Sequence, residues 1–218
     1  MGNWKQNILL FDLDGTLTDS AEGILRSAQY MQKKMGMRVW SESELAFMIG
    51  PPLTVSFGQG MGMSETQVQQ AISYFRERYF DVGLFENKVY DNIPETLSAL
   101  RKQGKRLAVA TSKHQSTAQR ILDHFGLTPY FEVIGGDAPG GGRTDKQKVV
   151  AYVLEQMQAQ KDDVVMIGDR KYDIEGAHAL GIPAIGVLYG YGSQAEFDAC
   201  QADAVVHTPQ ELLTLFGI

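Results

Sequence analysis

The sequence is short of the features that mark secreted and membrane proteins. Cys200 is the single cysteine among 218 residues, so an internal disulfide, and with it a disulfide-stapled secreted scaffold, is excluded. The N-terminal apolar run, Ile8 to Phe11, is far too short for a signal-peptide core or a membrane span. We therefore predict a cytoplasmic protein with no membrane partner.

Basic side chains are also in deficit. The chain has 20 Lys and Arg residues against 26 Asp and Glu residues, which gives a net charge of −6. Nonspecific nucleic-acid binding needs a basic surface, so we predict no nucleic-acid partner. The hydrophobic fraction of 44% is normal for a soluble globular protein, and the chain can bury a sizeable core.

The hydrophobic pattern divides the chain into a helical segment and an alternating segment. Residues 19–88 have helical spacing, with capping boxes at Ser41 and Ser64 and a helix expected to be capped by Ser20. Further on, short apolar strands alternate with helices, the last of which is expected to start with a capping box at Thr208. The strands are expected at residues 8–11, 107–110, 131–134, 164–167, 184–188 and 204–206.

This pattern predicts an α/β fold. Strands that alternate with helices form a parallel sheet with helices on both faces. We expect a doubly wound, Rossmann-like core built from residues 1–18 and 89–218, with an all-helical cap inserted at residues 19–88.

Polar side chains follow the predicted strands at their carboxyl ends, where such sheets bind ligands. These side chains are Asp12, Asp14, Thr111, Ser112, Lys113, Asp169 and Asp173, with Lys146 at the start of a helix. Clustered carboxylates repel one another unless a cation joins them, and oxygen-only ligands suit Mg²⁺. With a lysine nearby, such a cluster would form a phosphate pocket, in which one of the two aspartates of the first loop attacks phosphorus and the other handles the proton.

Each of these residues also has an ordinary structural explanation. Asp and Gly are common turn formers, and a helix lysine is usually solvated. An EF-hand calcium loop starting at Asp12 is excluded, because its twelfth position is Gly23 rather than an acidic residue. The hypothesis depends on the combination at several strand ends, and not on any single motif.

The combination resembles the haloacid dehalogenase superfamily. Asp12-Leu13-Asp14-Gly15-Thr16 resembles its first motif, DxDGT, and the segment from Gly168 to Asp173 resembles its fourth, GDxxxD. The strand that ends at Thr111 is similar to the second motif, and Lys146 to the third. The helical insertion after the first motif is similar to a C1-type cap, and the most similar group is the phosphoglycolate-phosphatase-like and 5′-nucleotidase-like phosphatases.

The resemblance implies a role for each motif residue. Asp12 would be the nucleophile, and Asp14 the general acid and then the base. Thr111 would bind the phosphoryl group, and Lys146 would neutralise its charge. The proline-containing segment usual after the third-motif lysine is missing, so Lys148 competes with Lys146, which we prefer.

The metal and substrate contacts follow from the same resemblance. Mg²⁺ would be held by the Asp12 carboxylate, the Asp14 backbone carbonyl and Asp169, while Asp173 would bind through water or orient its neighbours. The residues expected to contact substrate are Gly15, Thr16, Ser112, Lys113, Gly50 and Pro51. The last two form a turn in the cap, which would open and close through hinges at residues 18–19 and 88–89.

The leading hypothesis is therefore a Mg²⁺-dependent phosphomonoesterase that works through an aspartyl-phosphate. Its substrate would be a small phosphate ester, either phosphoglycolate-like or a nucleoside 5′-monophosphate, which the sequence does not distinguish. Two alternatives stay open: a phosphomutase on the same scaffold, and a non-catalytic module that binds a phosphorylated ligand. We expect a monomer or a weak homodimer.

Overall fold

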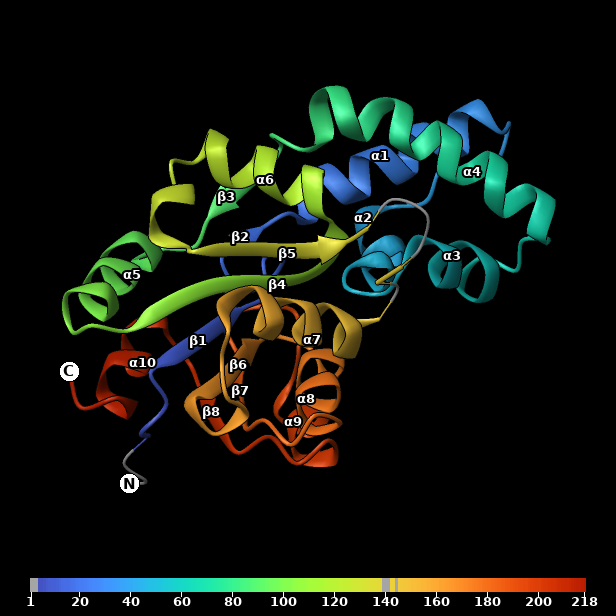
Figure 1. Ribbon diagram of the computed structural model, residues 1–218. Helices are drawn as coiled ribbons and strands as arrows, with labels where there is room; N and C mark the ends of the chain where they lie inside the picture. The colour runs from blue at the N-terminus through green and yellow to red at the C-terminus, as the bar shows by residue number, and fades with distance from the viewer. Residues whose placement is uncertain (1–3, 139–141, 144) are drawn as a thin grey trace. The chain divides into compact units, whose positions relative to one another are not determined.

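The chain forms two compact units in a computed structural model that describes residues 4–138, 142–143 and 145–218. The first unit comprises the chain up to Thr18 and from Val89 to Ile218, and the second comprises Asp19–Lys88 (Figure 1). The strands β2 (Thr18–Asp19) and β3 (Lys88–Val89) pair as a two-stranded sheet where the chain leaves the first unit and returns to it.

The first unit is built on a six-stranded sheet with the order β5-β4-β1-β6-β7-β8. Its strand pairs are parallel, and β1 lies inside the sheet, with Ile8 in register with Arg106 on one side and Val164 on the other. The strands are β1 (Ile8–Phe11), β4 (Arg106–His114), β5 (Val133–Asp137), β6 (Val164–Gly168), β7 (Ala184–Val187) and β8 (Ala204–Val206). The predicted α/β fold with a parallel sheet is confirmed.

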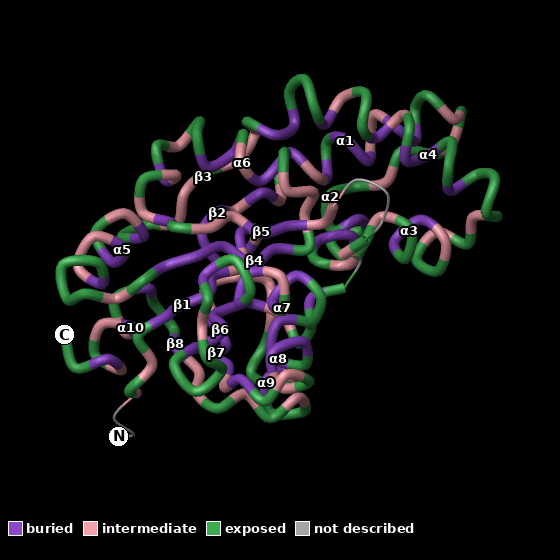
Figure 2. The backbone as a smooth tube through the Cα atoms, viewed as in Figure 1, coloured by how far each residue is buried: buried purple, intermediate pink, exposed green. Residues whose placement is uncertain are grey.

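Helices bury both faces of this sheet. Ile8 and Leu10 belong to a core cluster with apolar residues of α7 (Lys146–Met157) and α8 (Lys171–His178). Leu9 and Phe11 alternate with them and are also fully buried, as expected for a strand covered on both sides. Figure 2 shows the buried backbone running through the strands. The remaining helices of this unit are α5 (Ile93–Lys102), α6 (Gln115–His124), α9 (Gln194–Ala199) and α10 (Pro209–Leu215).

The second unit is helical. Its two long helices, α1 (Ala21–Lys34) and α4 (Glu65–Arg78), pack against each other, and α2 (Glu42–Leu45) and α3 (Leu53–Val55) are short. The predicted capping boxes at Ser41 and Ser64 both form, with each serine side chain accepting a hydrogen bond from the third residue of its helix. These boxes fix where α2 and α4 begin.

Two predicted caps are wrong. Ser20 precedes α1, but its backbone is not extended and its side chain makes no capping bond; the carboxylate of Asp19 accepts from the Ala21 N–H instead. Thr208 precedes α10 without a side-chain capping bond, and the Glu211 carboxylate accepts from the N–H of His207. In both helices the N–H of the third helical residue bonds to a backbone carbonyl, that of Glu86 for Gly23 and that of Thr208 for Glu211, so no hydroxyl caps it.

Two strands differ from the prediction by more than one residue at an end. The strand expected at residues 131–134 is β5, which begins at Val133, because a short 3-10 turn precedes it and Phe131 packs edge-on against Phe11. The strand expected at residues 107–110 is β4, which continues to His114. The helix α9 was not predicted. A run of only six residues carries little periodicity.

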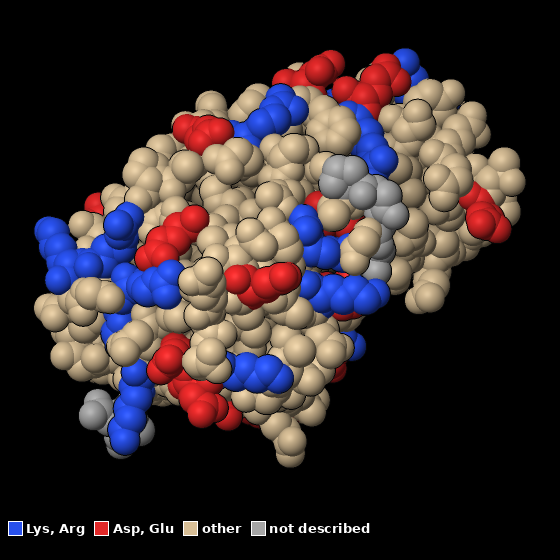
Figure 3. All heavy atoms as spheres, viewed as in Figure 1, with Lys and Arg blue, Asp and Glu red and all other residues tan. Residues whose placement is uncertain are grey.

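The surface carries both acidic and basic side chains, as the composition of the chain leads one to expect. Figure 3 shows acidic and basic side chains interspersed over the face drawn. Within the described residues, no helix has the length and apolar character that crossing a membrane requires.

A backbone contact in the helical unit generates a stability prediction. Gly23 in α1 donates its N–H to the Glu86 carbonyl at 2.9 Å, and a Cβ at Gly23 would lie 1.9 Å from the Gly83 carbonyl oxygen. We expect Gly23→Ala to lower the free energy of unfolding by ~1–3 kcal/mol, because backbone on both sides must move.

Chemical denaturation followed by circular dichroism measures this effect. Gly58→Ala is the matched control, because its Cβ would meet only Val68 at 3.8 Å, an ordinary contact. Equal stability of the two variants would contradict the close approach of α1 to the segment around Gly83.

Candidate active site

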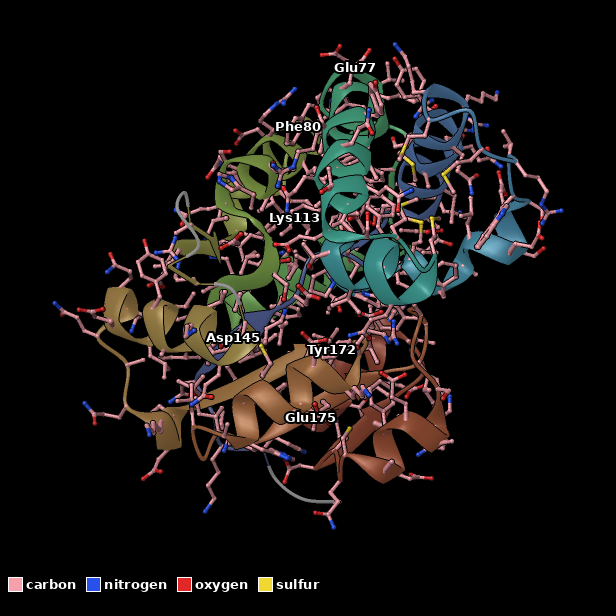
Figure 4. All side chains as sticks on the ribbon, turned by 90° about the vertical axis from the view of Figure 1, so that its right-hand side faces the viewer. Glu77, Phe80, Lys113, Asp145, Tyr172 and Glu175 are labelled. Atoms are coloured by element: carbon pink, nitrogen blue, oxygen red, sulfur yellow. The ribbon has the colours of Figure 1, made fainter. Side chains whose placement is uncertain are left out.

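Charged side chains from four segments of the first unit meet at the carboxyl edge of the sheet. Asp12 directly follows β1, Asp169 follows β6, Lys146 begins α7, and Asp173 lies in the first turn of α8. Figure 4 looks onto this edge, with Lys113 near the end of β4, Asp145 at the start of α7 and Tyr172 at the start of α8. The parallel topology brings together residues that are far apart in sequence.

Lys146 is the cation of this cluster. Its Nζ lies 3.0 Å from Asp12 Oδ1 and 2.7 Å from Asp173 Oδ1, and it donates to the Ala110 carbonyl at 2.9 Å. Burial alone would lower the pKa of Lys146, but the charges of Asp12 and Asp173 outweigh it and raise that pKa above its usual value. The amine therefore stays protonated, and holds the two carboxylates.

Asp169 is the most enclosed carboxylate. It is fully buried; its Oδ2 accepts from the Tyr191 N–H at 3.0 Å, and its Oδ1 accepts from the Thr16 hydroxyl at 3.4 Å. Burial raises the pKa of Asp169 well above the usual range, and the negative charges of Asp173 and Asp12 raise it further. Without a cation, this carboxyl is driven toward its neutral form.

Asp12 is held similarly but is more accessible. Burial is the main cause that raises its pKa to about 6, with Asp173 and Asp14 adding to the rise and Lys146 opposing it. Its side chain is 13% exposed, whereas that of Asp173 is 1% exposed. Asp12 is therefore the member of the cluster whose oxygens are best placed to meet a ligand.

These carboxylates fit a metal ion. Asp12, Asp169 and Asp173 each offer one oxygen within 4.8 Å of the others. The three carboxylates have one ammonium among them, that of Lys146, which contacts Asp12 and Asp173, so the ionised cluster has an excess of negative charge that a divalent cation would balance. Carboxylate ligands without His or Cys suit a hard ion such as Mg²⁺ or Ca²⁺ rather than Zn²⁺.

Asp14 is paired outside this cluster. Lys113 Nζ lies 2.9 Å from Asp14 Oδ1 and 2.8 Å from Oδ2. Thr111 is buried, and its hydroxyl accepts from the Lys113 N–H at 3.2 Å, while Ser112 is exposed. The structure thus gathers Asp14, Thr111 and Lys113 beside one another, and their predicted roles stay predictions.

The two candidate lysines differ in their surroundings. Lys146 is buried among the carboxylates, whereas Lys148 is an exposed residue that pairs with Asp145 at 2.9 Å. This geometry favours Lys146 for the phosphate. Gly50 and Pro51 belong to the helical unit, so their contact with substrate stays a prediction.

Close packing around Asp169 and Asp173 requires glycine. A Cβ at Gly15, whose φ is +80°, would lie 2.1 Å from Asp169 Oδ2, and a Cβ at Gly168 would lie 2.2 Å from the Asp173 carboxyl carbon. A Cβ at Gly190 would lie 2.1 Å from the Gly15 carbonyl oxygen. Glycine at these positions lets three backbone segments close around the carboxylates.

The loop after β7 is the part of the site that the sequence reasoning missed. It supplies Gly190 and the Tyr191 N–H that binds Asp169. The signal was present, because Gly190-Tyr191-Gly192 follows the strand expected at residues 184–188, at the same carboxyl edge. A main-chain N–H, however, is common to almost all residue types, so the sequence does not indicate which one will be a donor in the site.

Comparison with known proteins gives one family. Residues 9–187 match the family described as haloacid dehalogenase-like hydrolase. A predicted phosphatase from Clostridium acetobutylicum has a solved structure with a TM-score of 0.91 and 43% identity, covering 96% of this chain and 97% of that one.

Curated relatives have different names. A 5′-nucleotidase of Pseudomonas aeruginosa is 42% identical, covering 88% of this chain and 87% of its own. The tyrosine-protein kinase PtkA of Mycobacterium tuberculosis is 41% identical, covering 97% of this chain and 72% of its own. A phosphoglycolate phosphatase of Colwellia psychrerythraea is 31% identical, covering 86% of each chain.

The raised carboxyl pKa values predict how a divalent cation changes stability with pH. Without metal, the contribution of Asp12 is fully present below its unfolded pKa and is lost as pH rises through about 6, because folding favours the protonated form. The cation binds the ionised form, so we expect magnesium chloride to raise the melting temperature at pH 7.5 and to have little effect at pH 5.

Thermal unfolding with and without magnesium chloride at the two pH values tests this. Asp169→Asn, which removes one carboxylate of the cluster, should abolish the rise at pH 7.5. Equal stabilisation at both pH values would mean that the cation binds elsewhere.

Proposed function

The chain belongs to the haloacid dehalogenase-like hydrolase family and is a phosphatase of that family, and from this premise we propose that it is a Mg²⁺-dependent phosphomonoesterase that forms an aspartyl-phosphate on Asp12. The main support for this proposal is the environment of the Asp12 carboxylate. Its carboxylate lies 3.0 Å from the Lys146 ammonium and keeps partial access to solvent, while its two partner carboxylates are buried. A nucleophile needs this combination of restraint and access.

The acidic cluster supports the choice of metal. Mg²⁺ commonly takes one or two protein carboxylates together with waters and a substrate phosphate, and Asp12 and Asp169 can supply those carboxylates. The Asp14 main-chain carbonyl would be a further ligand. Asp173, held by Lys146 and by the Arg170 N–H, would orient the neighbouring ligands without being a direct ligand itself. When bound, the cation would offset charge on the phosphoryl oxygens.

The reaction would proceed in two phosphoryl transfers, first to Asp12 and then to water. In the first, an Asp12 oxygen bonds to phosphorus, the ester P–O bond breaks, and Asp14 gives its proton to the leaving oxygen. In the second, Asp14 takes a proton from water, whose oxygen bonds to phosphorus and displaces Asp12. Phosphate leaves, and both aspartates return to their starting states.

Thr111 and Lys146 complete the proposed site. The Thr111 hydroxyl accepts from the Lys113 N–H and still has its own hydrogen to donate to a phosphoryl oxygen. The Lys146 ammonium, with its pKa raised, stays charged and compensates the phosphoryl group. Both groups are buried, where such interactions are stronger than in water.

The substrate is proposed to be a small phosphate ester. The 5′-nucleotidase and the phosphoglycolate phosphatase among the relatives act, by their names, on a nucleotide and on a small phosphorylated acid. Since the nucleotidase has the higher identity, we place nucleoside 5′-monophosphates first.

A second candidate is phosphoryl transfer to a tyrosine. The similarity to a tyrosine-protein kinase covers 97% of this chain. On the same scaffold, the phosphoryl group of Asp12 would pass to a tyrosine hydroxyl rather than to water, with a nucleoside triphosphate as donor. Phosphotyrosine formed on the chain or on added protein in the presence of ATP would support this candidate over the hydrolase.

The mechanism predicts a metal-dependent enzyme that needs Asp12. We expect the enzyme to hydrolyse p-nitrophenyl phosphate in the presence of magnesium chloride. The rate should fall by at least ~10³-fold in excess EDTA, which removes the cation, and in Asp12→Asn, which removes the nucleophile and with it the covalent route. Asp162→Asn, at the other end of the sheet, is the matched control and should keep full activity. Full activity of Asp12→Asn would exclude the aspartyl-phosphate.

A substrate panel tests the proposed specificity. We expect kcat/KM for at least one nucleoside 5′-monophosphate to exceed that for phosphoglycolate and for sugar phosphates by ~10-fold or more, with phosphate release as the readout. The reverse order would move the assignment toward phosphoglycolate. Isomerisation of a sugar phosphate without phosphate release would identify a mutase.

A further inference from the structure

The Lys113–Asp14 pair is a feature that the proposed mechanism leaves unexplained. The Lys113 ammonium lies 2.9 and 2.8 Å from the two oxygens of the Asp14 carboxylate. The two side chains are 11% and 19% exposed, and the residues are 99 positions apart in the sequence. The pair therefore joins the end of β4 to the loop after β1 and is largely shielded from solvent.

The backbone of β4 is shaped to deliver this lysine. The pairing of β4 with β5 shifts register between Ala110 and His114, and within this stretch the Lys113 N–H bonds to the Thr111 hydroxyl at 3.2 Å. Such irregularities redirect side chains and are common beside active sites. The Lys113 ammonium, at the end of this stretch, pairs with Asp14, whereas Lys146 pairs with Asp12.

The pair differs from the exposed ion pairs of this protein. Lys148 and Asp145 lie 2.9 Å apart with side chains 57% and 49% exposed and are neighbours in one helical turn. Exposed pairs of that kind contribute ~0–1 kcal/mol and need no functional explanation. A shielded pair that holds both oxygens of one carboxylate restricts where that carboxylate can point.

We propose that Lys113 is a positioning residue that aims Asp14 at the leaving-group oxygen, a role that rests on the proposed phosphatase function. Before the first transfer, one oxygen of Asp14 carries the proton and faces the leaving oxygen, while the other stays with Lys113. When the ester bond breaks and the proton moves, both oxygens of Asp14 are open to Lys113, whose ammonium lies 2.9 and 2.8 Å from them. In the second transfer the Asp14 carboxylate, still held by Lys113, accepts the proton from water.

Leaving groups of graded basicity test this role. A p-nitrophenolate leaves without a proton, whereas an alkoxide needs one, so a misplaced Asp14 affects the second far more. For Lys113→Met we expect kcat/KM to fall by ~10²-fold on an alkyl phosphate and by less than ~3-fold on p-nitrophenyl phosphate. The ratio kcat/KM reports only the steps up to departure of the leaving group, so the later attack of water does not enter.

Three further variants make the assignment specific. Lys113→Arg keeps a cation beside Asp14 and should restore part of the loss on alkyl phosphates. Asp14→Asn should show the same dependence on leaving group, and adding Lys113→Met to it should bring little further change, because the two residues act as a unit. Lys34→Met, which removes the exposed Lys34–Glu77 pair of the helical unit, should leave kcat/KM for both substrates at the wild-type value.

The outcomes separate this inference from the proposed function. An equal fall in kcat/KM on all substrates in Lys113→Met would overturn the inference and make Lys113 a phosphate-binding lysine. The proposed phosphatase function would not be affected by that result. An inactive wild-type enzyme on every phosphate monoester would overturn both. Metal-induced stabilisation of Lys113→Met equal to that of wild type shows that the variant is folded with its acidic cluster in place.

Discussion

The buried contact between one ammonium and two carboxylates is the interaction on which the site depends. Lys146 lies within 3.0 Å of Asp12 and 2.7 Å of Asp173, and Asp169 adds a third negative charge nearby. One lysine does not balance three acids in a place from which water is largely excluded. When ionised, the site therefore has an excess of negative charge, which a further cation would balance.

The close approach of backbone segments follows from the same constraint. Because the carboxylates are buried, their remaining oxygens need donors, and the main chain provides them through the Tyr191 and Arg170 N–H groups. The main chain reaches these oxygens only where no side chain intervenes, which explains the glycines at 15, 168 and 190. Charge, burial and glycine placement are thus parts of one arrangement.

The sequence predicted those parts of the structure that depend on hydrophobic periodicity or on the chemical type of a side chain. The alternation of strands and helices gave the parallel sheet, and acidic residues after strands pointed to the edge where Asp12, Asp169 and Asp173 meet. The family was likewise recognisable from two aspartate motifs. Serine followed three positions later by Glu or Gln predicted two capping boxes correctly, since that pattern binds the backbone locally.

The remaining parts depend on tertiary geometry. Lys113 pairs with Asp14 across 99 positions of the sequence, and the donor at Tyr191 is a backbone group, so neither contact can be read from residue type. The failed caps at Ser20 and Thr208 show the same limit, because the N–H groups of Gly23 and Glu211, which they would cap, bond to the backbone carbonyls of Glu86 and Thr208.

The pairing of β2 with β3 has a consequence for how the chain folds. The central strand β1 is made first, yet its partners come much later, since Ile8 pairs with Arg106 and Val164. Closing so long a stretch of flexible chain is entropically costly. The β2–β3 ribbon holds the two ends of Asp19–Lys88 side by side, so that once this unit has formed, the loop that must close between β1 and β4 is effectively shorter and its closure costs less entropy.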